Sequence, residues 1–418
     1  MTLYRRRLLL FAAVVAGFSA AALFAFWLGQ QYPQGRDMEG FRWAAHRGVT
    51  LGWTHIYDPW TPAYGDLPIT AWLYTPLLPL SYAAAYPLTL ALSLAAVVGA
   101  WALAAPSRGL VRLAWLGALL AFLPLWNMLM EGQPSAVILL LLAFAVYSLR
   151  RQNSAAAGIA LAAAVQLKPT LAFMCAPALL VSGEGRAFVW FVIGSAVAGA
   201  AYLLVLGPGF PAAFLHASGS YLHHPTGLAG PMFGSPVVGY AVRALVAAGA
   251  LYAAWRRRDP VRAFGIGIVA SLVISPYLEL YDLVVVFAAA WTLEGWEVLA
   301  FLPGMVIAMV WYNSAPAVAG WEYVLLAALC LNPARRGNSS RQGWGKGLDK
   351  EVTPTDRLSV TASALRLLRL PRTFPSGPCG SLIGPVKGAQ YPNFCSPPGY
   401  VGWALEKLWI SRPVDAGI

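Results

Sequence analysis

Long apolar runs that carry almost no charge dominate this chain and leave few folds open to it. They fall at 8–28, 81–105, 113–130, 134–149, 155–167, 169–182, 187–206, 236–255, 263–275, 283–293, 298–312 and 317–331. A backbone in lipid must satisfy its own hydrogen bonds, so runs of this kind predict helices. Because a helix needs about 20 apolar residues to cross a bilayer, several runs are too short to span alone. The expected fold is all-α, a polytopic transmembrane helical bundle of about 10–12 spans.

The composition excludes several classes of protein. Hydrophobic residues make up 59% of the chain and charged residues 11%, whereas soluble domains have about 45–50% and about 25%. A cytosolic enzyme and a secreted disulfide scaffold are therefore excluded. The four cysteines are scattered, with no CxxC or Cys/His spacing, which argues against a metal site. We expect no metal and no cofactor.

The placement of arginine predicts the topology. If the runs alternate from a cytoplasmic amino terminus, the outer segments hold four basic residues, Arg36, Arg42, Arg47 and Lys168. The inner segments hold fourteen arginines, namely Arg5, Arg6, Arg7, Arg108, Arg112, Arg150, Arg151, Arg186, Arg256, Arg257, Arg258, Arg262, Arg335 and Arg336. Cytoplasmic loops of membrane proteins carry such an excess. We expect a multi-pass protein of the plasma (inner) membrane. The net charge of +12 is thus a topology signal and predicts no nucleic-acid partner.

The same alternation gathers the unusual polar residues on one outer face. They are Asp37, Asp58, Asp66, Glu131, Gln133, Lys168, His223, His224, Glu279, Asp282 and Asn313. Ionisable groups near bilayer depth are costly and usually line a cavity or pathway. Clustering on one face favours a site that opens outward, framed by the polar segments 30–80 and 207–235.

Two regions outside the spans have a distinct character. Gly40–Gly48 predicts a short helix lying on the membrane, with Phe41 and Trp43 as interfacial anchors. After Asn332 the apolar runs stop, and Pro, Gly, Ser and basic residues dominate. We therefore expect a membrane-embedded domain over 1–332 and a cytoplasmic, disordered tail over 333–418.

Four short motifs could carry chemistry, and each has an alternative structural role. Asp37 follows the first run and could act as the general base that takes a proton from an acceptor hydroxyl; the alternative is a solvated acid in a loop. Gln133 can bond sugar hydroxyls, or belongs to a tight turn. Lys168 suits phosphate, or snorkels to the interface. Residues 275–283 break an apolar stretch and line a cavity, or form an interfacial turn. A weaker candidate is the pair His223 and His224, which could bind phosphate when protonated.

These motifs, taken in order, make the chain resemble glycosyltransferase family 87, the polyprenol-phosphate-mannose-dependent mannosyltransferases with the membrane-embedded GT-C fold. The matching string covers about residues 1–332. It consists of Asp37, Phe41, Ile56-Tyr57-Asp58, Trp72-Leu73-Tyr74-Thr75-Pro76, Gly132-Gln133-Pro134, Gly158 through Lys168-Pro169, Ser275-Pro276-Tyr277 and Tyr281-Asp282-Leu283.

The resemblance implies a reaction and a set of site residues. It implies that a hexose, mannose by default, passes with inversion from a polyprenyl-phosphate donor to a hydroxyl of a glycolipid or glycan acceptor. The site would lie in an outer-face cavity beside membrane lipids. Asp37 would be the general base. The substrate-binding residues would be Arg36, Tyr57, Tyr74, Gln133, Lys168, His223, His224, Tyr277 and Asp282, with Lys168 and the histidines near the phosphate.

The main alternative is a transporter or flippase of lipid-linked sugars. Such proteins carry internal repeats and polar residues at the bilayer midplane. This chain shows no internal repeat, and its polar residues gather on one side. A purely structural membrane scaffold would leave Asp37 and Lys168 without a role. The sequence therefore favours a transferase.

Overall fold

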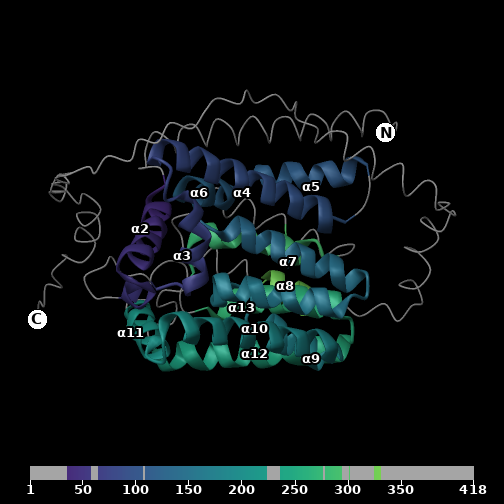
Figure 1. Cartoon of the computed structure of the whole chain (residues 1–418). Helices are drawn as coiled ribbons and strands as arrows, with labels where there is room; N and C mark the ends of the chain where they lie inside the picture. The colour runs from purple at the N-terminus through teal and green to yellow at the C-terminus, as the bar shows by residue number, and fades with distance from the viewer. Residues whose placement is uncertain are drawn as a thin grey trace, which may run out of the picture. The chain divides into compact units, whose positions relative to one another are not determined.

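Helices make up the part of the chain that the computed structural model describes, which comprises residues 35–57, 65–106, 109–223, 236–275, 278–293, 301 and 324–330 (Figure 1). These ranges belong to the first of two compact units, Met1–Arg335. The helices are α2 Arg36–Leu51, η1 Trp53–Tyr57, α3 Pro68–Tyr74, η2 Thr75–Leu77, α4 Tyr82–Ala104, α5 Leu110–Leu120, α6 Leu123–Glu131, α7 Ser135–Arg150, α8 Ser154–Leu167, η3 Pro169–Leu171, α9 Cys175–Val181, α10 Gly185–Leu206, α11 Phe210–His223, α12 Pro236–Arg257, α13 Pro260–Ile274, η4 Leu280–Val285 and α14 Val286–Ala290.

Three of these helices are long and apolar enough to cross a membrane: α4, α10 and the Val238–Arg257 part of α12. A fourth crossing results if α5 and α6 count as one bent span. Helices α7, α8, α13 and the stretch Leu280–Ala290 are apolar but shorter. The predicted class, a helical membrane protein, is confirmed. The predicted 10–12 spans exceed what the described residues contain. The runs at 8–28 and 298–312 and the tail at 333–418 lie outside those residues except for Phe301.

Two of the predicted helices are interrupted in the structure, one of them at a proline. The run 113–130 divides into α5 and α6, which meet at an angle of 53°. Phe122 is extended there and Pro124 lies in the first turn of α6, since proline cannot continue the preceding helix. The run 169–182 begins with Pro169 in the short helix η3, and α9 starts later. The hydroxyl of Ser271 accepts the Met174 N–H at 2.9 Å, which satisfies this backbone break.

Arg150 joins the carboxyl ends of three helices. Its guanidinium donates to the carbonyl of Ala104 at the end of α4, at 2.6 Å, and to the carbonyl of Trp291 just after α14. A cation at these termini offsets the partial negative charge of the helix ends. Two helices begin nearby with side-chain caps, Asn153 for α8 and Asp259 for α13. We call this side of the bundle the Arg150 end and the opposite side the Asp37 end.

The packing separates a buried centre from an exterior with exposed apolar side chains. Helix α7 packs between α4 and α8, and α13 packs on α9 and α12. Small residues allow the close contact of α8 with α10, because a Cβ added to Gly158 would lie 2.2 Å from the carbonyl oxygen of Ala187. On α10 and α12, by contrast, Leu204 is 87% exposed and Leu245 is 73% exposed. Such faces suit contact with acyl chains.

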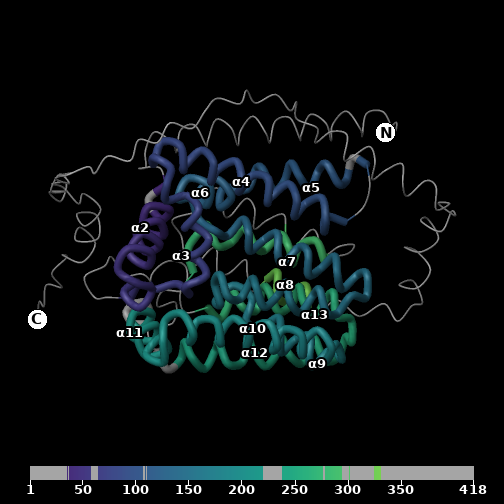
Figure 2. Tube along the Cα trace, in the orientation of Figure 1, coloured from purple at the N-terminus to yellow at the C-terminus, as the bar shows by residue number. Residues whose placement is uncertain are grey.

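Helix α2 is longer than predicted and is packed against protein. Figure 2 shows α2, α3 and α11 gathered at one end of the long helices. Met38, Phe41, Ala44 and Ala45 lie on one buried face of α2, as their helical spacing requires. The ring of Phe41 stacks on Tyr74 with centroids 5.0 Å apart. The prediction that Phe41 is a membrane-interface anchor is therefore wrong.

Candidate functional site

A tight turn over residues 132–135 organises the Asp37 end. Gly132 closes α6 with φ 67° and ψ 37°, a left-handed conformation that glycine adopts without penalty. Its carbonyl accepts the Tyr74 hydroxyl at 2.6 Å. One residue before α2 begins, the N–H of Gly35 donates to the carbonyl of Met130 at 2.5 Å. These bonds dock the end of α3 on the turn between α6 and α7, and the start of α2 on the last turn of α6.

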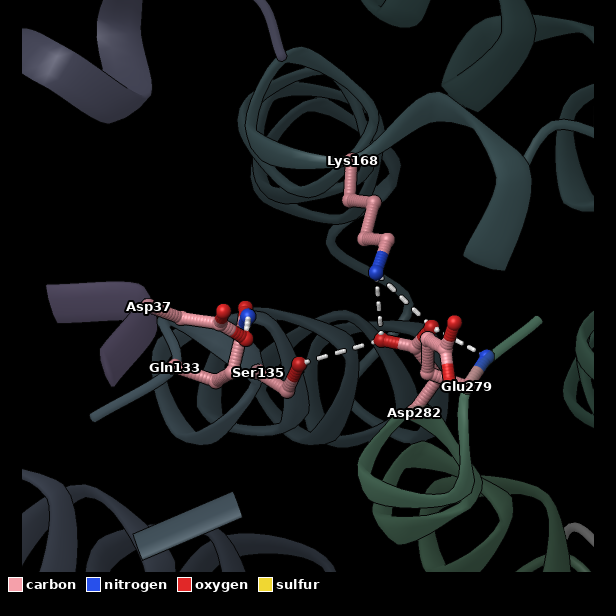
Figure 3. A network of polar contacts seen from close by, with 6 residues as sticks. All are labelled: Asp37, Gln133, Ser135, Lys168, Glu279 and Asp282. Carbon is pink, nitrogen blue, oxygen red and sulfur yellow. Dashed lines mark hydrogen bonds and ion pairs between the residues drawn. The ribbon is translucent and has the colours of Figure 1, made fainter. Parts of the chain in front are cut away.

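That docking brings Asp37 to Gln133 (Figure 3). Gln133 is 4% exposed, and its Nε2 donates to Oδ2 of Asp37. Asp37 lies in the first turn of α2 and is partly buried. A carboxylate there is favoured by the partial positive charge of the helix amino terminus.

A buried ion pair lies on the other side of the turn. The ammonium of Lys168 is 2.8 Å from Oδ1 and 2.7 Å from Oδ2 of Asp282. It also lies 5.0 Å from the centroid of the Tyr281 ring. The side chains of Lys168 and Asp282 are 8% and 0% exposed. Buried charges require partners of this kind, so the pair fixes the end of α8 against the start of η4.

Asp282 is further held by two donors. The hydroxyl of Ser135 lies 3.4 Å from its Oδ1, and the backbone N–H of Glu279 donates to Oδ2 at 3.1 Å. The Glu279 side chain in turn accepts the Asp282 N–H and so caps η4. Gln133 and Ser135, on either side of Pro134, thus connect one turn to both Asp37 and the ion pair, as Figure 3 shows.

The first turn of α3 and the segment before it also reach this site. The hydroxyl of Thr70 donates to the carbonyl of Leu167 at 3.0 Å, next to Lys168. Asp66 lies four residues before Thr70, and its backbone carbonyl accepts the Tyr57 hydroxyl at 2.8 Å. Burial raises the pKa of the Asp66 carboxyl to about 6; Lys168 opposes this shift, whereas Asp282 and Asp37 add to it. Asp66 therefore shares the electrostatic environment of the site.

The structure brings together four of the residues predicted from the sequence: Asp37, Gln133, Lys168 and Asp282. Tyr57 and Tyr74 lie around these four residues, but each donates its hydroxyl proton to a backbone carbonyl. Arg36 is the first residue of α2 and His223 the last of α11. Their side chains, together with His224 and Tyr277, lie outside what the structure describes.

The sequence does not predict several of the residues that the structure places at the site. Ser135 directly follows Pro134, so its proximity to a predicted motif was an available signal. Tyr281 lies in the predicted 275–283 motif but has no site role of its own in the prediction. Thr70 belongs to no motif. Asp66 was expected on the same face but without a role. Within the described ranges no three His, Cys, Asp or Glu side chains come together as a metal site. The chemistry available here is a carboxylate, an amide and an ion pair.

Comparison with known proteins adds a family assignment. The family model of glycosyltransferase family 87 matches residues 67–276. This range includes Gln133 and Lys168, and it ends before Asp282. No curated protein matches the chain. Because the match covers half of the chain, the protein belongs to glycosyltransferase family 87.

Proposed function

We propose that this glycosyltransferase moves a hexose, mannose by its family resemblance, from a polyprenyl-phosphate donor to a hydroxyl of a glycolipid or glycan acceptor. The reaction would occur on the extracytoplasmic face of the plasma membrane, at the Asp37 end of the bundle. Arginines cluster in the turns at the opposite end, which suits a cytoplasmic location. The amino terminus would also be cytoplasmic.

The observation that carries this proposal is the chain of contacts that links Asp37 to Lys168 through the 132–135 turn. Asp37 of α2 accepts from Gln133 in the turn, and Ser135 at the start of α7 lies 3.4 Å from Asp282, which binds Lys168 at the end of α8. A base and a cation on opposite sides of one turn suit a transfer in which a proton is taken up and a phosphate departs.

The proposed step balances as follows. The carboxylate of Asp37 takes the proton of the acceptor hydroxyl while that oxygen forms a bond to the anomeric carbon. The bond between this carbon and the phosphate oxygen breaks, and its electron pair leaves with the polyprenyl phosphate. Attack from the face opposite the phosphate inverts the anomeric configuration.

Lys168 would stabilise the negative charge that develops on the departing phosphate. Its ammonium is held between both oxygens of Asp282, so the cation is already oriented before the donor binds. Asp282 would share that ammonium with the phosphate. Arg36, His223 and His224 would add positive charge, as the family resemblance implies.

The sugar would lie against Tyr57, Tyr74 and Tyr277, beside the turn that carries Gln133. Because the phenols of Tyr57 and Tyr74 donate to backbone carbonyls, their oxygens would act toward a sugar hydroxyl as acceptors. The exposed apolar faces of α10 and α12 would remain in contact with membrane lipids.

The test is transfer of label from polyprenyl-phosphate-mannose to candidate lipid acceptors in membranes that contain the protein. We expect a labelled product that Asp37→Asn reduces by ~100-fold or more. Movement of the labelled donor across the bilayer without any product would instead support a flippase. Absence of transfer from every polyprenyl-phosphate sugar would refute the proposal.

A further inference from the structure

The amide of Gln133 faces a carboxylate, which restricts what this side chain can do. An ionised carboxylate only accepts hydrogen bonds, so the amide must turn its NH2 group toward Asp37. The contact joins Nε2 of Gln133 to Oδ2 of Asp37. That donor is therefore directed at the carboxylate rather than at a sugar.

The peptide that carries Gln133 is also immobilised. Its backbone N–H donates to the carbonyl of Met128 at 3.1 Å, and Pro134 follows it directly. Gly132 leaves no room for a side chain, because an added Cβ would lie 2.7 Å from Cβ of Met38 on α2. Gly35, one residue before α2, donates to the carbonyl of Met130 in the last turn of α6. Amide and carboxylate are thus parts of one rigid assembly.

We propose that Gln133 is a positioning residue that holds the carboxylate of Asp37 in the orientation needed to accept the proton of the acceptor hydroxyl. This inference rests on the proposed role of Asp37 as general base. A base must lie within hydrogen-bond reach of the proton that it takes. Fixing Oδ2 sets the direction of the remaining lone pairs, and a misplacement of about 1 Å costs ~100-fold in rate.

Other titratable groups surround Asp37 and must be considered in any pH experiment. Asp66 and Tyr74 interact with it electrostatically. Tyr82 and Tyr86 pack at Gly35, two residues before it, and Glu131 precedes the 132–135 turn. Of these, Asp66 has a pKa of about 6. The experiment therefore compares variants within a wild-type and an Asp66→Asn background.

The first measurement uses Gln133→Met, which keeps the length of the side chain and removes the donor. Turnover per inserted molecule should fall by ~100-fold, with little change in the KM for the donor. The hydrogen bond from the Gln133 amide favours the ionised carboxylate of Asp37. Its loss in Gln133→Met should therefore move the acid limb of the kcat/KM profile to higher pH in both backgrounds. Gln152→Met, at the exposed turn beyond the other end of α7, should behave as wild type.

A double-variant cycle separates positioning from sugar binding. If Gln133 acts through Asp37, adding Gln133→Met to Asp37→Asn should cause no further loss of turnover. An additive loss with a raised KM and an unmoved acid limb would show a direct sugar contact and overturn the inference. Gln133→Asn, which retracts the amide by one methylene, gives an independent check and should lose activity partially with the same shift.

The outcomes also distinguish this inference from the proposed function. An inactive Asp37→Asn together with a fully active Gln133→Met would leave the proposed base standing and overturn the positioning role alone. A fully active Asp37→Asn would refute both.

Discussion

Asp37 is the residue on which the proposed chemistry depends. A sugar hydroxyl is a poor nucleophile until its proton is removed, and Asp37→Asn keeps shape while removing basicity. We expect turnover to fall by ~100-fold or more, with the protein level unchanged and Asp37→Glu retaining a trace. Radiolabel transfer in membranes measures this.

The control for Asp37 is a nearby acid on the same helix. Glu39 lies in the first turn of α2 and is exposed, so Glu39→Gln should retain activity. Asp58→Asn and Asp66→Asn should also be tolerated better than Asp37→Asn. If Asp37→Asn is active and one of these variants is dead, the base has been assigned to the wrong residue.

Asp66 should make stability depend on pH. The carboxyl of an aspartate has an ordinary pKa of 3.8, and burial raises the pKa of Asp66 to about 6 in the folded protein. Between these two values the folded protein therefore binds more protons than the unfolded chain. The free energy of unfolding should therefore fall as pH rises from about 4 to about 6. Asp66→Asn should remove this part of the dependence. Thermal unfolding in detergent across that range, wild type against variant, measures it; parallel profiles would contradict the assignment.

Packing between elements depends on the turn that joins α6 to α7. An alanine at Gly132 would adopt a left-handed conformation at a cost of about 1–2 kcal/mol. Its Cβ would also press on Met38 at 2.7 Å. Gly132→Ala should therefore lower the unfolding temperature and separate Gln133 from Asp37, with a large loss of turnover.

Gly40 provides the comparison within α2. A Cβ at this position meets nothing within 4 Å, and alanine is a better helix former than glycine. Gly40→Ala should leave stability unchanged or raise it. Equal behaviour of Gly40→Ala and Gly132→Ala in thermal unfolding and transfer assays would show that the turn is not rigid.

The ion pair between Lys168 and Asp282 should serve both the fold and the reaction. Lys168→Met leaves a buried carboxylate without its cation, which costs about 3–5 kcal/mol. The double variant Lys168→Met/Asp282→Asn removes both charges and should recover most of the folded protein. It should remain inactive if the ammonium also holds the phosphate.

Detergent-extracted yield and transfer activity, measured on the single and double variants, separate these roles. Lys168→Arg should keep part of both, since the charge is retained with a different geometry. Recovery of full activity in the double variant would refute a phosphate role for Lys168.

For the molecule as a whole, the prediction concerns which end faces the cytoplasm. Reporter fusions near Arg108, Arg151 and Arg257 should be cytoplasmic, and fusions near Thr61 and His223 should be external, because the arginine excess belongs inside. A cytoplasmic reporter at Thr61 would place the Asp37 end on the wrong side for the proposed donor and acceptor.

The sequence alone determined that the protein is a helical membrane protein, and it located the ends of the apolar helices α4, α7, α8, α10 and α12. These features follow from local chemistry: apolar runs demand intrahelical hydrogen bonds in lipid, and prolines such as Pro124 and Pro169 end or begin helices. It also selected Asp37, Gln133, Lys168 and Asp282 as candidates, because polar side chains that lie between or beside such runs, near bilayer depth, usually line a cavity.

The tertiary structure decided which of these side chains contact one another. Gln133 lies 96 residues from Asp37 in the sequence and Lys168 lies 114 residues from Asp282. From the sequence, Gln133 is predicted to contact a sugar and Lys168 a phosphate; the structure adds that each side chain donates to a carboxylate of another element. Such pairings depend on how helices rotate and dock, here through Gly132 and Thr70. Because many residues set that packing together, no local pattern in the sequence could specify it.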